Sequence, residues 1–121
     1  MHPLRRHFSK SPDELLSLCD MQDNEIGFMF RKLRTKSLVI NRSSSIFVVK
    51  SASLLYVQKR KWTKSWCPGY FDLTFGGLVR FGVGYEENAY RELQEELNIE
   101  NVHLEPLFKY IVQYIVLEKE G

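Results

Sequence analysis

The chain has 121 residues, 44% of them hydrophobic and 26% charged, which is the composition of one soluble globular domain. No apolar run approaches the roughly 20 residues of a membrane-spanning helix, so a transmembrane protein is excluded. The two cysteines, Cys19 and Cys67, provide neither a disulfide framework nor the spacing of a metal finger. We therefore expect a cytoplasmic protein.

The net charge of +2 conceals an uneven distribution. Residues 1–64 carry 13 Lys and Arg against 5 Asp and Glu, whereas residues 65–121 carry 4 against 10. This pattern predicts a basic surface that faces an acidic site. Residues 1–10 are expected to be a tail and residues 11–121 one domain, and the acidic Asp13 and Glu14 argue against an organelle-targeting segment.

The first predicted elements are short. Leu15–Asp20 is too brief to sustain a helix and fits a strand equally well. The turn formers of residues 20–24 precede Glu25–Phe28, which is expected as a return strand. Phe30–Leu38 has a helical apolar stripe, with its basic residues on the solvated side.

Residues typical of strands dominate the middle of the chain. Ser45–Val49 and Leu54–Gln58 are predicted to be adjacent strands, because the polar Lys50–Ser53 has the length of a hairpin connection. Phe71–Thr74 is a further strand candidate, and it runs into a glycine pair at residues 76–77.

A basic loop at residues 59–69 contains four cations and two tryptophans, Trp62 and Trp66. Cations interleaved with aromatic rings bind single-stranded nucleic acid in some proteins. Packing of the rings beneath a solvated rim is the commoner role of such a loop. Nucleic-acid binding is therefore kept only as an alternative, whose sign would be a steep fall of affinity with salt.

Glu86–Leu97 is the strongest predicted helix, since it has good helix formers, an acidic first turn and Asn98 as its stop. Val102–Glu118, which follows, is predicted to be extended. Within the helix, Glu92, Glu95 and Glu96 share one face next to an apolar face. These carboxylates repel one another. A hard divalent cation would neutralise them, whereas the helix alone favours a solvated acidic face.

Residues 77–99 read GLVRFGVGYEENAYRELQEELNI and resemble the signature of the Nudix hydrolases. That signature is glycine, five residues, glutamate, seven residues, Arg-Glu-aliphatic-any-Glu-Glu, any residue, glycine and an aliphatic residue. The matched positions are Gly77, Arg91, Glu92, Leu93, Glu95, Glu96 and Ile99. Val83 replaces the first signature glutamate and removes a carboxylate from the loop. Asn98 replaces the signature glycine, which is a mild change because Asn tolerates a left-handed cap.

The resemblance implies an α/β fold, a Nudix-type α/β/α sandwich with a mixed sheet. The chain ends 25 residues beyond Glu96. We expect that C-terminal elements of this fold are missing, and that a second copy or another partner covers the face they would occupy.

The similarity extends to the branch of the family related to isopentenyl diphosphate isomerase. It includes Asn24–Gly27, Val57–Arg60 and Pro68–Asp72. That isomerase needs a cysteine whose place falls near Gly76, and Cys67 lies on the wrong side of the Pro-Gly turn. The resemblance therefore implies a hydrolase rather than an isomerase.

The implied reaction is Mg²⁺- or Mn²⁺-dependent hydrolysis of the diphosphate linkage in a nucleoside diphosphate joined to another moiety. The implied catalytic residues are Glu92, Glu95, Glu96 and Arg91, of which the three glutamates would be metal ligands. The implied substrate-binding residues are Arg60, Lys64, Gly76 and Gly77. The alternative, motivated by Val83 and by the early end of the chain, is a Nudix module that binds nucleotide or a partner without turnover.

Overall fold

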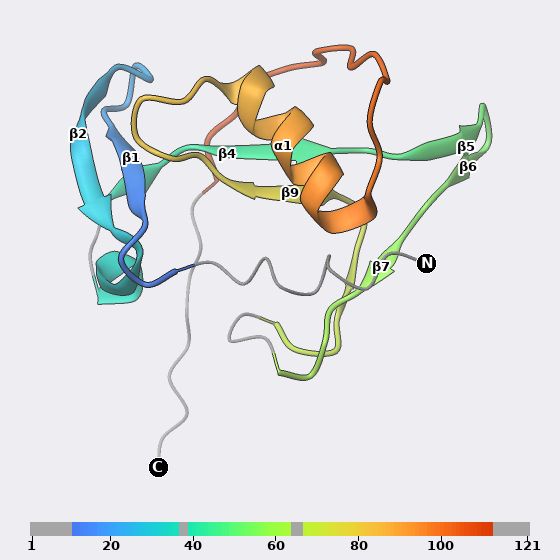
Figure 1. Ribbon diagram of the computed structural model, residues 1–121, viewed down its shortest axis with the longest axis horizontal. Coiled ribbons are helices and arrows are strands. Elements are labelled where there is room, and N and C mark those ends of the chain that lie inside the picture. The colour runs from blue at the N-terminus through green and yellow to red at the C-terminus, as the bar shows by residue number, and fades with distance from the viewer. Residues whose placement is uncertain (1–10, 37–38, 64–66, 113–121) are drawn as a thin grey trace.

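The computed structural model describes residues 11–36, 39–63 and 67–112. Figure 1 shows the helix α1 (Tyr85–Leu97) lying across short strands. A 3₁₀ helix, η2, covers Arg31–Lys36. The strands are β1 (Leu15–Cys19), β2 (Glu25–Phe30), β3 (Ile40–Asn41), β4 (Ser43–Ile46), β5 (Val49–Ser51), β6 (Leu54–Leu55), β7 (Gln58–Lys59), β8 (Phe71–Asp72) and β9 (Phe75–Leu78).

The strands form four small sheets. One has the order β2-β1-β3, and the others pair β4 with β9, β5 with β6 and β7 with β8. Every strand pair in the described ranges is antiparallel, and α1 is their one α-helix. The mixed sheet that we expected is thus not seen in these ranges. Turns of a few residues, as between β1 and β2 or β5 and β6, permit only antiparallel pairing.

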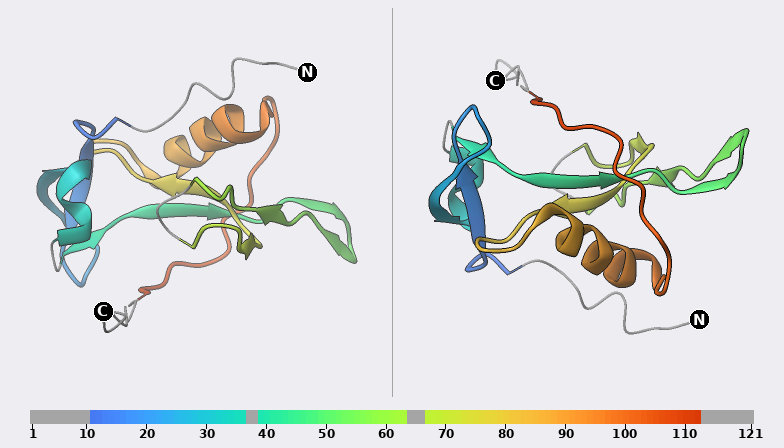
Figure 2. Two further views of the ribbon diagram at one scale, coloured as in Figure 1. Left: turned by 90° about the horizontal axis from the view of Figure 1, so that it is seen from below. Right: turned by 90° about the horizontal axis from the view of Figure 1, so that it is seen from above.

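Helix α1 covers one face of the β4–β9 pair, and residues 99–112 cross to the opposite face (Figure 2). Its contact with the sheet buries Ile46 of β4 together with Ala89 and Leu93 of α1. The first turn is fastened to β4, because Ser44 Oγ donates a hydrogen bond to the carbonyl of Tyr85 at 2.8 Å. No helix in the described ranges has the length and apolar character needed to span a membrane.

The predicted helix is confirmed, and so is its stop. Asn98 adopts the left-handed conformation with φ of 56°, and its N–H bonds back to the carbonyl of Gln94 at 3.0 Å. The return strand at Glu25–Phe28 is confirmed as β2. Leu15–Asp20 is a strand rather than a helix, because β1 finds partners on both edges.

Three other element predictions need correction. Phe30–Leu38 forms only η2 within its described part. The two central strands are shorter than predicted, although their hairpin exists as β5 and β6. The prediction of extended strand over Val102–Glu118 is wrong for residues 102–112, where no strand forms. Strand-type residues need a neighbouring strand to pair with, and this part of the segment has none. Residues 113–118 lie outside the described ranges.

The sheet of β1 abuts the loop that follows β9. The N–H of Ser17 donates to the carbonyl of Val79 at 3.0 Å, and the N–H of Phe81 donates to the carbonyl of Leu15 at 3.0 Å. Leu16, between these two bonds, is fully buried. The N-terminal sheet therefore supports the segment that leads into α1.

Asp23, in the turn between β1 and β2, joins several distant segments. Its carboxylate accepts hydrogen bonds from Arg42 Nε at 2.7 Å, Tyr85 Oη at 2.7 Å and Lys109 Nζ at 2.6 Å. Desolvation by burial would raise the pKa of Asp23, but the bonds from Lys109, Tyr85 and Arg42 outweigh it and lower the pKa from 3.8 to about 2. Burial and the bond to Asp23 also raise the pKa of Tyr85.

We predict that Asp23 makes the free energy of unfolding depend on pH in the acidic range. Because its pKa is lower in the folded state, its contribution is complete above pH 3.8 and is lost as the pH falls towards 2. Asp23→Asn should therefore lower the free energy of unfolding by about 2 kcal/mol at pH 6, with the difference from wild type shrinking below pH 4. Urea unfolding across this pH range measures both quantities.

The matched control is Asp13→Asn, whose carboxylate is 74% exposed. This change should alter the free energy of unfolding by less than about 0.5 kcal/mol at either pH. An Asp23→Asn variant that differs from wild type by the same amount at pH 2 and pH 6 would contradict the assignment.

Candidate functional site

Glu92 of α1 carries a carboxylate that is fully buried. The carboxylate lies against Gly77 of β9, where a Cβ atom would come within 2.8 Å of Glu92 Oε1 and 3.1 Å of the carboxyl carbon. Any residue with a side chain at position 77 would displace this carboxylate. The helix and the strand thus hold an acidic group directly against the strand backbone.

Gly76 is required for a different reason. Its φ of +132° is a conformation that residues with a Cβ rarely adopt, and a Cβ there would lie 2.1 Å from the carbonyl oxygen of Ser44 in β4. The glycine pair therefore allows two close approaches, one to β4 and one to α1.

Arg91 lies between the signature carboxylates. Its Nη2 is 3.7 Å from Glu92 Oε1, and its Nη1 is 3.5 Å from Glu95 Oε1. Both glutamates are shielded from solvent, with side-chain exposures of 0% and 11%, whereas Glu96 is exposed. The guanidinium offsets the repulsion that carboxylates at this helical spacing exert on each other.

The three signature glutamates are not gathered into a metal cage. No group of three or more His, Cys, Asp or Glu side chains in the described part of the chain is placed to hold a metal ion. The carboxylate of Glu92 lies against β9, that of Glu95 lies 3.5 Å from Arg91, and that of Glu96 is exposed. A metal centre made of all three, as the resemblance implies, would thus need Glu95 or Glu96 to change rotamer.

The loop between β9 and α1 receives a carboxylate from elsewhere in the chain. Val83, at the place of the missing signature glutamate, is half-buried in a turn closed by its N–H and the carbonyl of Arg80 at 3.1 Å. Glu25 Oε2 of β2 accepts from the N–H of Gly82 at 3.2 Å. Bonds from Ser17 Oγ and from this N–H lower the pKa of Glu25. The loop is thereby held by an ionised group on a neighbouring strand.

Two residues of this site escaped the sequence reasoning. Asn88 is fully buried in α1 and bonds to both Gly77 and Arg91. Glu25 was recognised only as part of a strand and of the stretch Asn24–Gly27 in the family resemblance. Asparagine is a poor helix former, so its presence inside a strong helix was the one available signal for Asn88. Nothing in the local sequence indicates that Glu25 reaches the loop.

Of the predicted phosphate-binding residues, Arg60 lies on another part of the fold. Arg60 follows β7, and its backbone pairs with that of Tyr70 across the β7–β8 hairpin at 2.8 Å. Figure 1 shows this hairpin extending away from α1. Lys64 and Trp66 lie outside the described residues. Phosphate binding by Arg60 and Lys64 stays a prediction.

Trp62 of the basic loop and Phe71 of the following strand β8 are open to solvent. Trp62 is 75% exposed and Phe71 is 74% exposed, and Lys59 Nζ lies 5.7 Å and 5.9 Å from the centres of their rings. Gly69 packs so closely against Trp62 that a Cβ atom would collide with the indole. The ring is thus held by its own hairpin, and nucleic-acid binding by this loop stays an untested alternative.

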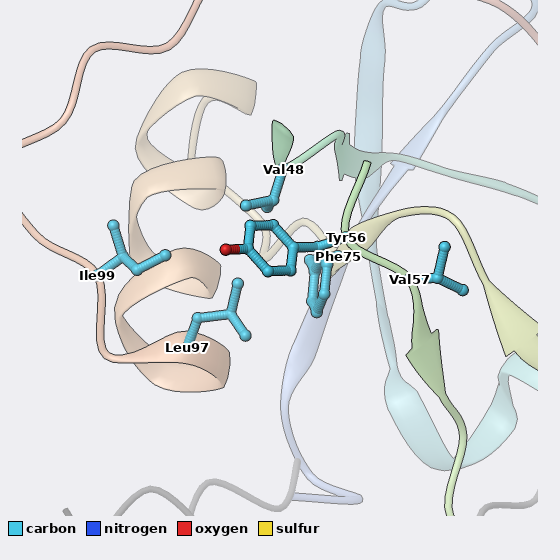
Figure 3. Close-up of a pocket in the computed structure, with 6 residues that line it drawn as sticks. All are labelled: Val48, Tyr56, Val57, Phe75, Leu97 and Ile99. Atoms are coloured by element: carbon cyan, nitrogen blue, oxygen red, sulfur yellow. The ribbon is translucent and has the colours of Figure 1, made fainter. Parts of the chain in front are cut away.

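An apolar hollow of about 300 Å³ lies near the C-terminal end of α1 (Figure 3). It is lined by Val48, Tyr56, Val57, Phe75, Leu97 and Ile99. Figure 3 shows the ring of Tyr56 between Val48 and Leu97, with its hydroxyl towards the helix. No charged side chain lines the hollow, so it has none of the groups that bind phosphate or metal.

Comparison with known proteins identifies the family. The model of the NUDIX domain matches residues 31–117, which is most of the chain. The chain therefore belongs to the Nudix hydrolases. A crystal structure of DR0079 from Deinococcus radiodurans superposes with a TM-score of 0.60 at 32% sequence identity, covering 72% of this chain and 54% of that one. The fold is accordingly the Nudix fold, α/β with mostly antiparallel strands and one main helix.

Curated relatives agree with this assignment. The chain is 41% identical over 99 residues to an uncharacterised Nudix hydrolase, PA4841, of Pseudomonas aeruginosa, covering 81% of this chain and 58% of that protein. It is 34% identical over 88 residues to an isopentenyl-diphosphate Δ-isomerase of Photorhabdus laumondii, covering 73% of this chain and 50% of that protein. The chain spans between half and three fifths of the length of these two relatives.

We predict that Gly77→Ala will displace the Glu92 carboxylate. The new methyl group would meet Glu92 Oε1 at 2.8 Å, so the side chain must leave its buried position. We expect a loss of about 1 to 3 kcal/mol in the free energy of unfolding, together with a shifted side-chain carboxyl resonance of Glu92 in carbon-13 NMR spectra.

Gly27→Ala is the control, because a Cβ there meets nothing within 4 Å and β2 is extended. It should leave stability unchanged or raise it by up to about 1 kcal/mol, with no change in the Glu92 resonance. Equal behaviour of the two variants would show that Gly77 is not needed for the buried carboxylate.

Proposed function

We propose that the chain is a divalent-metal-dependent hydrolase of a diphosphate linkage, acting on a nucleoside diphosphate joined to another moiety. The observation that carries the proposal is the buried Glu92 carboxylate, held against Gly77 and accompanied by Arg91 and Glu95. Burial of a carboxylate costs several kcal/mol in lost hydration, which is typical of a group retained for function. The match to the Nudix signature at Gly77, Arg91, Glu92, Leu93, Glu95, Glu96 and Ile99 supports the same proposal.

The donor groups of this site fit Mg²⁺ or Mn²⁺. All are oxygen atoms, which are the ligands that hard cations prefer, and Mg²⁺ is commonly bound by one or two carboxylates together with substrate phosphates. Glu92, Glu95 and Glu96 are the carboxylates that would hold the cation, and Glu95 or Glu96 would have to change rotamer to do so. When bound, the cation neutralises charge on the diphosphate and makes a water molecule more acidic.

A backbone carbonyl of β9 would be a further oxygen ligand of the cation, and the carbonyl of Gly76 suits this role better than that of Gly77. The carbonyl of Gly77 already accepts from Asn88 Nδ2 at 3.1 Å and from Ser43 Oγ at 3.2 Å. Gly76 is paired with Ser45 in the antiparallel β4–β9 ladder. Hydrogen-bonded and non-hydrogen-bonded pairs alternate along such a ladder, and Gly76 with Ser45 is a non-hydrogen-bonded pair. The carbonyl of Gly76 therefore points away from β4. We assign Gly76 as the backbone contributor and Gly77 as the residue that makes room for Glu92.

The protein side chains have distinct tasks in the reaction. Water attacks one phosphorus atom, the bridging P–O bond breaks, and the proton of the water passes to a carboxylate. Glu96 is suited to receive it when it is not holding the cation, because its carboxylate is exposed to water. The positive charge of Arg91 offsets the repulsion between Glu92 and Glu95, and its guanidinium orients both carboxylates. Arg60 is proposed to hold a substrate phosphate.

A second candidate is a Nudix module that binds nucleotide without turnover. It is favoured by Val83 at the place of a signature carboxylate and by the separation of the three glutamates in the described residues. The two candidates differ in product release. If the protein binds Mn²⁺ and nucleoside diphosphates, but releases no phosphate or monophosphate from nucleotide sugars, dinucleoside polyphosphates, coenzymes or capped RNA, the binding module is correct.

We predict that Glu95→Gln and Glu96→Gln will each lower kcat/KM for Mg²⁺-dependent diphosphate hydrolysis by about 100-fold or more, because each removes a charge that the reaction uses. Phosphate release on a panel of diphosphate compounds is the measurement. The control is Glu87→Gln, an exposed glutamate in the first turn of the same helix, which should retain wild-type activity. Hydrolysis that survives both substitutions at the wild-type rate would refute the proposed function.

A further inference from the structure

Asn88 is a polar side chain fully buried in α1, and both halves of its amide have partners. Its Nδ2 donates a hydrogen bond to the carbonyl of Gly77 at 3.1 Å, and its Oδ1 accepts one from Arg91 Nη2 at 2.6 Å. An amide can be buried at little cost only when such bonds satisfy it. Asn88 therefore connects the glycine strand to the signature arginine.

This connection determines where Arg91 points. The Nη2 atom that is bonded to Asn88 is also the one that lies 3.7 Å from Glu92 Oε1, while Nη1 lies 3.5 Å from Glu95. An arginine side chain has several rotatable bonds, and that of Arg91 is 21% exposed. The bond to Asn88 Oδ1 fixes Nη2, the end of the guanidinium that faces Glu92, and thereby directs Nη1 towards Glu95.

The second bond fixes the strand. By donating to the carbonyl of Gly77, Asn88 holds β9 at the distance at which the Glu92 carboxylate fits over the glycine. The Asn88 side chain thus positions both Arg91 and β9. The Glu92 carboxylate lies between these two.

We propose that Asn88 is a positioning residue, which sets the signature carboxylates for metal binding through Arg91 and Gly77. The proposal rests on the proposed function, since it concerns the same site. Asn88 itself does not touch the substrate. Its loss should therefore weaken metal binding and lower kcat, while leaving KM for the diphosphate substrate within twofold of wild type.

The test uses Asn88→Leu, which removes both hydrogen bonds and keeps the branching of the side chain at Cγ, although leucine is larger. The affinity for Mn²⁺ alone is measured by electron paramagnetic resonance, and kcat and KM are measured with Mg²⁺. We expect the Mn²⁺ dissociation constant to rise at least fivefold and kcat to fall at least tenfold. If Asn88→Leu does not fold, Asn88→Ser, whose hydroxyl is too short to make both bonds, is measured in the same way.

The matched control is Asn98→Ala, which changes the same residue type at the end of the same helix. Asn98 has a left-handed φ of 56°, so alanine there destabilises the helix without touching Arg91 or Gly77. This variant should lower Tm and keep the Mn²⁺ affinity and kcat of wild type. If it weakens Mn²⁺ binding as much as Asn88→Leu does, the role of Asn88 is merely structural and the proposal is wrong.

The outcomes separate this proposal from the proposed function. Wild-type hydrolysis together with unchanged Mn²⁺ affinity and kcat in Asn88→Leu overturns the positioning role and leaves the hydrolase intact. Absence of hydrolysis in wild type, with Mn²⁺ binding that weakens in Asn88→Leu, overturns the hydrolase and supports the positioning role. A wild-type protein that does not bind Mn²⁺ overturns both.

Discussion

The structure depends on one contact, the Glu92 carboxylate buried against Gly77. Removing a carboxylate from water costs free energy. Here Arg91 on the same helix offsets the charge of Glu92, and the absence of a side chain at Gly77 leaves room for its carboxylate. This requirement explains why α1 crosses β9 where it does. It also explains why Ala89 and Leu93 form the apolar face beside the carboxylates, since they dock the helix on the sheet.

The N-terminal strands contribute to the site although they precede the matched Nudix region, residues 31–117. Glu25 of β2 accepts from Gly82 in the loop before α1, and Glu14 forms an ion pair with Arg80 of the same loop. Carboxylates from β2 and from the segment before β1 thus reach the loop in which Val83 stands at the place of the signature glutamate. In this chain the geometry of the loop follows from long-range contacts as well as from the signature.

The sequence was most informative where structure is local. The helix, its Asn98 stop and the spacing of the glutamates follow from propensity and periodicity within a few turns. Residues 102–112 contradicted a strand prediction, because pairing depends on a neighbour that composition does not reveal. Asn88 was missed for the same reason, since its role depends on Gly77, 11 residues away in another element. The separation of the glutamates was also invisible, because spacing defines a shared face but not a rotamer.

The central claim is that α1 and the glycine strand together form a divalent-metal site. The most direct measurement is paramagnetic broadening of backbone amide signals in the intact chain by substoichiometric Mn²⁺, with Ca²⁺ as the diamagnetic reference. The account predicts that the signals of Gly76, Gly77 and residues 92–96 broaden first, and those of the β5–β6 hairpin last. Broadening centred on the β7–β8 hairpin, or spread evenly over acidic residues of the surface, would contradict it.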